Sequence, residues 1–186
     1  MPEWQEAEDS ELLAQAQNGN VEAFGVLYER HVVKVHRFLT AHLDNPLDAE
    51  DLTSDVFIRA WRALPFFHDR GVPFPAYLLR IARNAMVDQF RRPSLVSPHS
   101  LADVENVHPQ AQTEPAEIVI SRIEQQNLRH VLQQLRPDYR TVLVLRFLSG
   151  LSPEETARVM RHSTGAVRVL QHRALAALRS LLSVDE

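Results

Sequence analysis

A stretch with four prolines divides this chain into two parts, each of a size that suits one small domain. Residues 93–115 carry prolines at positions 93, 98, 109 and 115 and show little helical or strand periodicity. This composition is typical of a linker. Fully extended at ~3.3 Å per residue, the linker reaches roughly 75 Å. We therefore expect two small domains, at 1–92 and 116–186, which a flexible linker allows to bind separate sites.

The first part has the apolar spacing of four helices. The chain holds only 5 glycines, and Val, Ile and Thr rarely alternate with polar residues, which favours helices over strands. Asn20 can cap a helix with apolar residues at helical spacing, and Asn45-Pro46 ends that helix. The four expected helices begin near residue 9 or 10, at 20, near Asp48 and near Ala76, and the last one runs to 92. We expect an all-α, four-helix domain.

The second part ends in a helix-turn-helix pattern. Residues 118–135 and 137–148 each have the spacing of one helix. Ser152, Pro153 and Glu155 predict a helix start, because serine caps, proline fits the first position and glutamate completes a capping box. This short helix ends by residues 161–162, in a turn without the frequent glycine, and Ser163 can cap a longer helix with arginines. The pattern is typical of DNA-binding proteins, although many helical hairpins share it.

Charge is distributed unevenly along the chain. The net charge is −4, yet residues 1–60 carry −8, and the segments 61–92 and 137–182 each carry +4. Two basic segments in an acidic chain suggest two nucleic-acid contacts. The same two basic segments also fit two solvated helix faces, and charge alone slightly favours this second interpretation.

The sequence carries no recognisable catalytic, metal or cofactor site. The absence of cysteine excludes disulfides and thiolate zinc sites. His31 and His36 are five residues apart, a poor spacing for a shared metal, and there is no glycine-rich phosphate loop or nucleophile elbow. No apolar run approaches the ~18 residues of a membrane span, and the N-terminus is acidic where a signal peptide is basic. We expect a cytoplasmic protein that is not an enzyme, uses no cofactor and does not insert into membranes.

Three motifs follow one another along the chain: DAEDLTSDVFIRAW at 48–61, LRIARN at 79–84 with DQFRR at 88–92, and LRFLSGLSPEETA at 145–157. In this order they resemble the polymerase-binding helix, the promoter −10 helix and the −35 helix-turn-helix of extracytoplasmic-function (ECF) sigma factors, group 4 of the sigma-70 family. The resemblance implies a sigma-2-like domain at 1–92 and a sigma-4-like domain at 116–186. It also implies promoter recognition, −10 strand capture and transcription initiation in a bacterium, with core RNA polymerase, promoter DNA and an anti-sigma factor as partners.

The first motif places Asp51, Asp55 and Arg59 on one helix face, at i, i+4 and i+8. The resemblance makes this face, together with Ser54, the contact with the clamp helices of the polymerase. Ser54 and Asp55 stand where family members often carry Gln-Glu, so Ser54 is a shorter side chain while Asp55 keeps the charge. A solvated helix face is the alternative.

The second motif belongs to a segment that mixes aromatic residues with arginines. This composition suits single-stranded DNA, which is held by stacking and by phosphate contacts. The resemblance assigns the −10 strand to Phe67, Arg80, Asn84, Arg91 and Arg92, and it implies that one base is turned out of the stack into a pocket. Three other aromatic residues of the segment are expected in the core: Trp61, Phe74 and Phe90.

The last helix carries the third candidate site. Arg168 and His172 are four residues apart and face away from the expected core, with Arg173 beside them. The resemblance makes Arg168 a −35 contact, and an arginine can bind either a guanine edge or a phosphate. Ser163 and Thr164 at the helix start can donate to a phosphate.

Two other functions remain open from the sequence. A two-domain helix-turn-helix regulator that binds duplex DNA as a dimer explains residues 137–182, but it leaves the acidic helix and the aromatic–arginine segment without a role. A helical protein-interaction adaptor, with both basic segments merely solvated, is the third function. Palindromic half-sites would favour the regulator, and absence of DNA binding by the C-terminal part would favour the adaptor.

Overall fold

The structure is a computed structural model that describes residues 7–68, 72–91 and 128–183. Every regular element in these ranges is helical, which confirms the predicted all-α class. The expected linker at 93–115 lies outside the described residues, as does the beginning of the helix expected at 118–135, of which 128–134 is described and helical. The elements are α1 (Asp9–Gln17), α2 (Val21–Thr40), α3 (Pro46–Ala63), the 3-10 turn η2 (Leu64–Phe66), α4 (Phe74–Arg91), α6 (Pro137–Leu143), the π turn η3 (Val144–Leu148), α7 (Pro153–Met160) and α8 (Thr164–Leu182).

Asparagine caps begin both long helices before α4. The Asn20 side-chain oxygen accepts hydrogen bonds from two backbone N–H groups of the first turn of α2, at 3.0 and 3.2 Å. Asn45 accepts one such bond at 3.0 Å in α3, whose first position is Pro46. α3 therefore begins two residues before the expected Asp48, because an asparagine cap followed by proline is itself a helix start.

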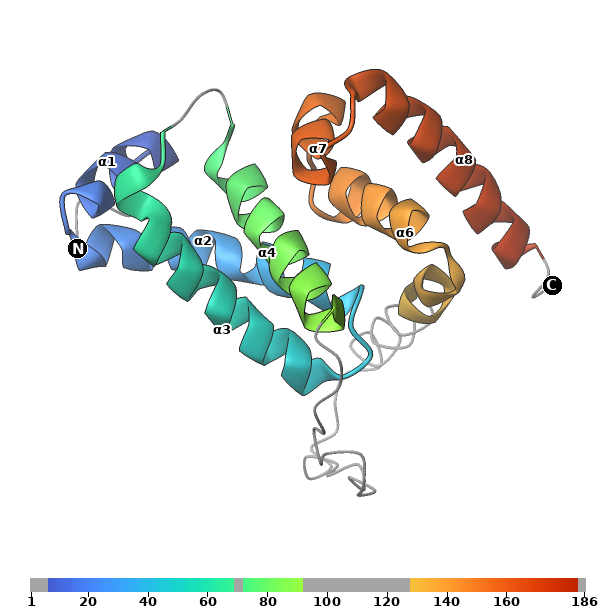
Figure 1. Ribbon diagram of the computed structural model, residues 1–186, viewed down its shortest axis with the longest axis horizontal. Helices are drawn as coiled ribbons and strands as arrows, with labels where there is room; N and C mark the ends of the chain where they lie inside the picture. Colours follow the sequence, from blue (N-terminus) through green and yellow to red (C-terminus); the bar gives the residue numbers. More distant parts are fainter. Residues whose placement is uncertain (1–6, 69–71, 92–127, 184–186) are drawn as a thin grey trace, which may run out of the picture.

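The helices α1 to α4 pack around one apolar core (Figure 1). Asp9 holds α1 to α2, since its carboxylate lies 3.0 Å from the Arg30 guanidinium and 2.6 Å from Nε2 of His31. Burial lowers the pKa of His31, although Asp9 acts in the opposite direction. The largest fully buried side chains of this part are Leu12, Leu27, Val35, Phe38, Leu39, Val56, Leu64, Leu78 and Leu79.

The helix expected at 137–148 has a wider final turn than the periodicity predicts. In η3 the N–H of Ser149 donates to the carbonyl of Val144 at 2.8 Å, one residue further than in an α-helix. The Arg146 side chain extends from this turn toward α8, where its Nε donates to the side-chain oxygen of Gln171 at 2.9 Å. A second N–H of Arg146 donates to the carbonyl of Leu151. The π turn thus links α6, the start of α7 and α8.

α7 and α8 form the expected helix-turn-helix (Figure 1). The Ser152 hydroxyl accepts from the N–H of Glu155 at 3.1 Å, and the Glu155 carboxylate accepts from the N–H of Ser152 at 2.6 Å, which completes the predicted capping box. Ser163 caps α8 with a hydrogen bond of 3.2 Å to a backbone N–H. Between the helices, Arg161 takes the left-handed conformation, with φ 58° and ψ 45°, where glycine is frequent.

Arg161→Gly should stabilise the chain against unfolding. A side chain in the left-handed region costs about 1 kcal/mol relative to glycine, and Arg161 is the one non-glycine residue in the described ranges with a positive φ. We expect urea denaturation, followed by circular dichroism, to give a free energy of unfolding higher by about 0.5–1 kcal/mol. Arg161→Val is the control and should lower it, because β-branched residues are disfavoured further there. A lower stability of the glycine variant would show that the arginine makes a compensating contact.

The C-terminal part packs directly on the N-terminal part. α4 lies between α3 and α7 (Figure 1). His42 is buried in the contact, where Nδ1 lies 2.8 Å from the carbonyl oxygen of Phe38 and Nε2 lies 3.0 Å from the hydroxyl of Thr141. A carbonyl oxygen only accepts, so Nδ1 carries the proton and Nε2 accepts from Thr141. Arg129 donates to two carbonyls of the loop between α2 and α3, at 2.5 and 2.8 Å.

Candidate functional site

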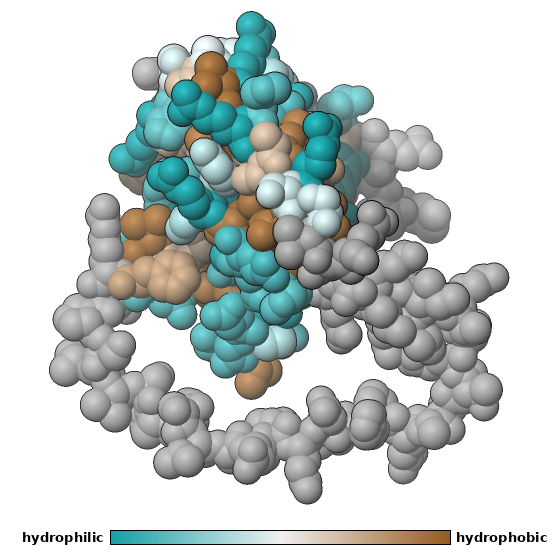
Figure 2. Space-filling model, turned by 90° about the vertical axis from the view of Figure 1, so that its right-hand side faces the viewer, coloured by the Kyte–Doolittle hydropathy of each residue, from teal (hydrophilic) through white to brown (hydrophobic). Residues whose placement is uncertain are grey.

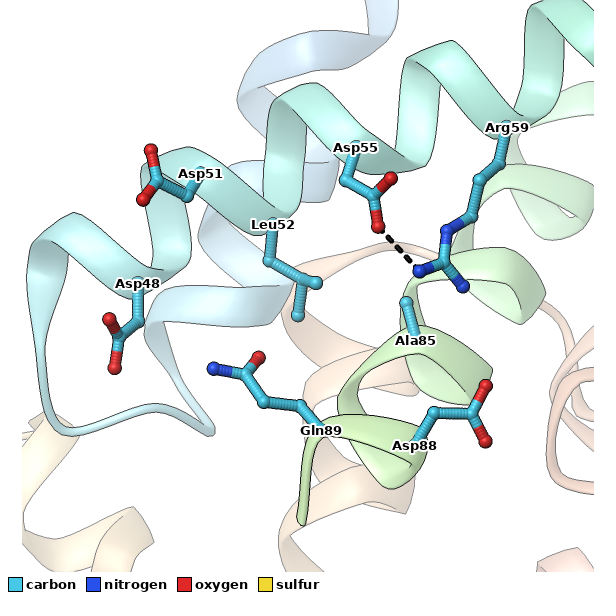
Figure 3. Close-up of a pocket in the computed structure, with 8 residues that line it drawn as sticks. All are labelled: Asp48, Asp51, Leu52, Asp55, Arg59, Ala85, Asp88 and Gln89. Atoms are coloured by element: carbon cyan, nitrogen blue, oxygen red, sulfur yellow. Dashed lines mark ion pairs between the residues drawn. The ribbon is translucent and has the colours of Figure 1, made fainter. Parts of the chain in front are cut away.

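A shallow groove lies between α3 and the last turns of α4 (Figure 3). Its volume is about 310 Å³. Four carboxylates and one guanidinium line it, which gives a formal charge of −3 and a surface that attracts cations. We call it the acidic groove, and its residues are Asp48, Asp51, Leu52, Asp55 and Arg59 from α3 and Ala85, Asp88 and Gln89 from α4.

The acidic groove brings together three of the four residues predicted to bind the polymerase: Asp51, Asp55 and Arg59. Asp55 and Arg59 form an ion pair at 2.6 Å, and each side chain is 41% exposed (Figure 3). Ser54 does not line the groove, and its hydroxyl donates to a backbone carbonyl of α3 at 3.3 Å. Asp88 and Gln89 belong to the motif assigned to the −10 helix and were not predicted to join the polymerase-binding residues, because only the packing of α4 on α3 brings them to the groove.

Phe67 lies in the core rather than on the surface expected for the −10 strand. It is 9% exposed, and its ring centroid lies 4.5 Å from that of Tyr77 and 6.0 Å from that of Phe74. Gln17 of α1 holds the backbone here, because its Nε2 donates to the carbonyls of Phe67 and Leu64 at 2.6 and 3.2 Å. The Phe67 ring would have to leave this cluster before it could stack on a base.

Arg80 and Asn84 lie one turn apart on α4, and both are half-buried. The Arg80 guanidinium sits over the Tyr77 ring, 5.4 Å from its centroid, in a cation–π contact that orients it. Arg91 is the last residue of α4, and Arg92 lies outside the described residues. The structure therefore places one cation and one amide of the predicted −10 set close together.

The three aromatic residues expected in the core have different environments. Phe74 is buried, and Trp61 is half-buried against Phe24, with ring centroids 4.8 Å apart. Phe90 is 67% exposed, so its prediction as a core residue is wrong. Residues 88–90, near the end of α4, are all exposed.

The residues predicted for the −35 element lie on α8 and at its start. Figure 2 shows the side of the molecule on which α8 lies, where hydrophilic and hydrophobic side chains are interspersed. Glu154 of α7 approaches the Arg168 guanidinium at 3.5 Å. Four of the five predicted residues are exposed and Thr164 is half-buried; the exposed ones are Ser163, Arg168, His172 and Arg173.

The described residues form neither a membrane span nor a metal site. Among the helices that the structure describes, none is long and apolar enough to cross a bilayer. Within 7–68, 72–91 and 128–183, no group of His, Asp and Glu side chains has an arrangement that could hold a metal ion.

Two family models match the chain. Residues 27–94 match sigma-70 region 2, and residues 125–178 match sigma-70 region 4. The ECF RNA polymerase sigma factor BldN of Streptomyces coelicolor is 36% identical over 178 residues, which make up 94% of this chain and 66% of BldN. The RNA polymerase sigma factor CnrH of Cupriavidus metallidurans is 36% identical over 183 residues, which make up 95% of each chain.

Two solved structures are similar over most of the chain. CnrH in complex with the cytosolic domain of CnrY is 33% identical, with a TM-score of 0.74, over 96% of this chain and 99% of that one. The sigma factor RpoE of Bartonella quintana, in complex with the anti-sigma factor NepR, is 26% identical, with a TM-score of 0.66, over 88% of this chain and 98% of that one.

The matches to sigma-70 region 2 and region 4 occur in the predicted order along the chain, and together they span most of the described residues. The chain thus belongs to the ECF sigma factors of the sigma-70 family.

Proposed function

We propose that this sigma factor docks on core RNA polymerase through the acidic groove and directs it to promoters with two sequence elements. The groove carries this proposal, because it is open to solvent, is formed by two rigid helices and has a formal charge of −3. A basic helical surface of the polymerase would complement this charge, which favours fast and selective association. Leu52 and Ala85 supply apolar contact area between the charged side chains.

The −10 element is bound as a single strand by α4 in this proposal. Asn84 can pair with a base edge, while Arg80 contacts the phosphate backbone. Binding of exposed bases offsets the free energy of strand separation, so the chain opens DNA without a chemical step of its own. Catalysis then belongs to the polymerase, and this chain is not an enzyme.

The −35 element is bound as a duplex by α8, with Arg168 in the major groove and Ser163 and Thr164 near a phosphate. We propose domains at 1–92 and 116–186 with a linker at 93–115. Support comes from the two family regions, which leave residues 95–124 between them. Since α7 covers one side of α4 in this structure, the two domains separate when both promoter elements are bound.

An anti-sigma factor completes the proposal. CnrH is known in complex with the cytosolic domain of CnrY, and RpoE in complex with the anti-sigma factor NepR. A partner of this kind would bind the present chain in the bacterial cytoplasm, where polymerase and DNA are also found. The dimeric helix-turn-helix regulator is not favoured. That function leaves the acidic helix and the aromatic–arginine segment without a role, and the region 2 match covers both of them.

Arg168→Ala and Asn84→Ala should each remove the dependence on one promoter element. A side-chain contact to a base contributes ~1–3 kcal/mol, so we expect transcription from the intact promoter to fall about tenfold in each variant. Arg168→Ala should no longer respond to changes in the −35 element, and Asn84→Ala should no longer respond to changes in the −10 element.

The measurement is run-off transcription with core polymerase on four templates: intact, −35 changed, −10 changed and both changed. Arg179→Ala is a matched control, because it removes an exposed arginine from the last turn of α8. If each variant responds to both elements as the unchanged chain does, the assignment of α8 to −35 and α4 to −10 is wrong. Binding to palindromic duplex DNA without polymerase would favour the dimeric regulator.

A further inference from the structure

Val169 is a large apolar side chain that stays exposed in the second turn of α8, with 52% of its surface open to solvent. The opposite side of the helix is buried, since Val167 and Ala174 are fully inaccessible. Two positions along an α-helix are about 200° apart, so Val169 points away from the core that Val167 enters. α8 packs on α6 and α7 at the edge of the molecule (Figure 1). The exposed valine therefore contributes little to the packing of the fold.

The helix surface beside Val169 is open. Side chains of an α-helix lean toward its N-terminus, so Val169 extends over the turn that holds Gly165 and Ala166. Both of these residues are exposed and small. A Cβ atom added to Gly165 would meet no other atom within 4 Å. A ligand can therefore come close to the helix backbone here and touch the methyl groups of Val169.

The charge around Val169 suits a polyanion. α8 contains three arginines and no acidic residue. Arg168 precedes Val169, Arg173 follows it by one turn, and both are exposed. Protein interfaces use contiguous apolar patches, whereas DNA combines a charged backbone with base edges in its grooves. In the major groove, the apolar group that a base presents is the C5-methyl group of thymine.

We propose that Val169 contacts the C5-methyl group of a thymine in the −35 element and so determines which base is preferred at that position. The first turns of a recognition helix contact base edges, and Val169 lies in the second turn of α8. Arg168 can bind a guanine edge or a phosphate beside it, so the two residues contact different chemical groups. The inference rests on the proposed function and adds a thymine preference to it.

The test replaces thymine with uracil, which lacks the C5-methyl group and pairs with adenine in the same way. The full chain and core polymerase transcribe a promoter that carries uracil at one thymine position of the −35 element at a time, on either strand. The variants are Val169→Ala and, as a matched control, Val33→Ala, which makes the same change at an exposed position of α2. Circular dichroism checks that both variants keep their helices.

With the unchanged chain, uracil at one −35 position should lower transcription about fourfold, which corresponds to one buried methyl group at ~0.8 kcal/mol. Val169→Ala should transcribe the thymine template about fourfold less than the unchanged chain does. It should show no further loss when uracil stands at that position, because the contact is already absent. Val33→Ala should respond to uracil as the unchanged chain does.

The inference is overturned if no thymine of the −35 element responds to uracil, or if Val169→Ala responds as strongly as the unchanged chain. Weaker binding of Val169→Ala to core polymerase without DNA would overturn it too, in favour of a protein contact. Failure of the proposed function is distinguishable, since the unchanged chain would then give no transcript, or transcripts that no change of the −35 element affects.

Discussion

Asp55→Arg is expected to abolish binding to core RNA polymerase, with a loss of affinity of about 100-fold or more. Asp55 lies in the middle of the acidic groove and forms an ion pair with Arg59 at 2.6 Å. The substitution removes this acceptor, places two arginines four residues apart and reduces the negative charge of the groove by two. Like charges that face each other across an interface cost several kcal/mol, and ~1.4 kcal/mol corresponds to a factor of ten.

The matched control is Glu29→Arg, which makes the same charge change at an exposed position of α2. It should leave the affinity for polymerase nearly unchanged, and circular dichroism should show that both variants keep their helices. The affinity is measured by titrating labelled protein with core polymerase. Binding of Asp55→Arg at the strength of the unchanged chain would remove the acidic groove as the docking surface.

The buried His42 should make the chain lose stability as the pH falls from 6.5 toward 4. Burial, with Arg140 and Arg83 nearby, lowers the pKa of His42 to about 4 in the folded chain. The unfolded chain takes up this proton at about pH 6.5, whereas the folded chain does not. The neutral ring therefore stabilises the folded state fully above pH 6.5, and its contribution disappears as the pH falls to 4. The free energy of unfolding therefore falls by about 3 kcal/mol over the whole interval, and by about 2 kcal/mol between neutral pH and pH 5.

His42→Gln tests this prediction, because glutamine is polar and does not titrate. We expect it to be less stable than the unchanged chain at pH 7.5 in urea denaturation, since the contact with Thr141 is altered. The difference between the two proteins should shrink by about 2 kcal/mol at pH 5. The pKa of His31 is also lowered. Its contribution to the pH dependence of stability is the same in both proteins, so it cancels when their free energies of unfolding are subtracted. A difference that does not change with pH would contradict the burial of a neutral His42.

The local structure of this chain could be predicted well where one residue type determines it. Asn20, Ser152 with Glu155, and Ser163 cap helices as expected, because a short side chain with an oxygen satisfies the free N–H groups of a first turn wherever it precedes an apolar repeat. The buried stripe of each helix follows from the same repeat. These features depend on neighbours within four residues.

The features that the sequence did not reveal depend on contacts between distant segments. Asp88 and Gln89 join the acidic groove only because α4 packs on α3. The hydrogen bond from Arg146 of the π turn to Gln171 of α8 joins residues that are 25 positions apart in the sequence. Phe66 and Phe67 are adjacent and chemically identical, so only the packing of Phe67 against Tyr77 decides which ring is exposed.

Transcription in vitro by core polymerase without another sigma factor tests the central claim most directly. The purified chain is added to this polymerase with a library of bacterial promoter DNA, and the 5′ ends of the transcripts are mapped. The proposed function predicts discrete transcripts that start at a fixed distance downstream of two paired motifs and that disappear with Asp55→Arg. If neither transcripts nor co-elution with the polymerase are found, and the chain instead binds palindromic duplex DNA, the proposed promoter-directing role is contradicted.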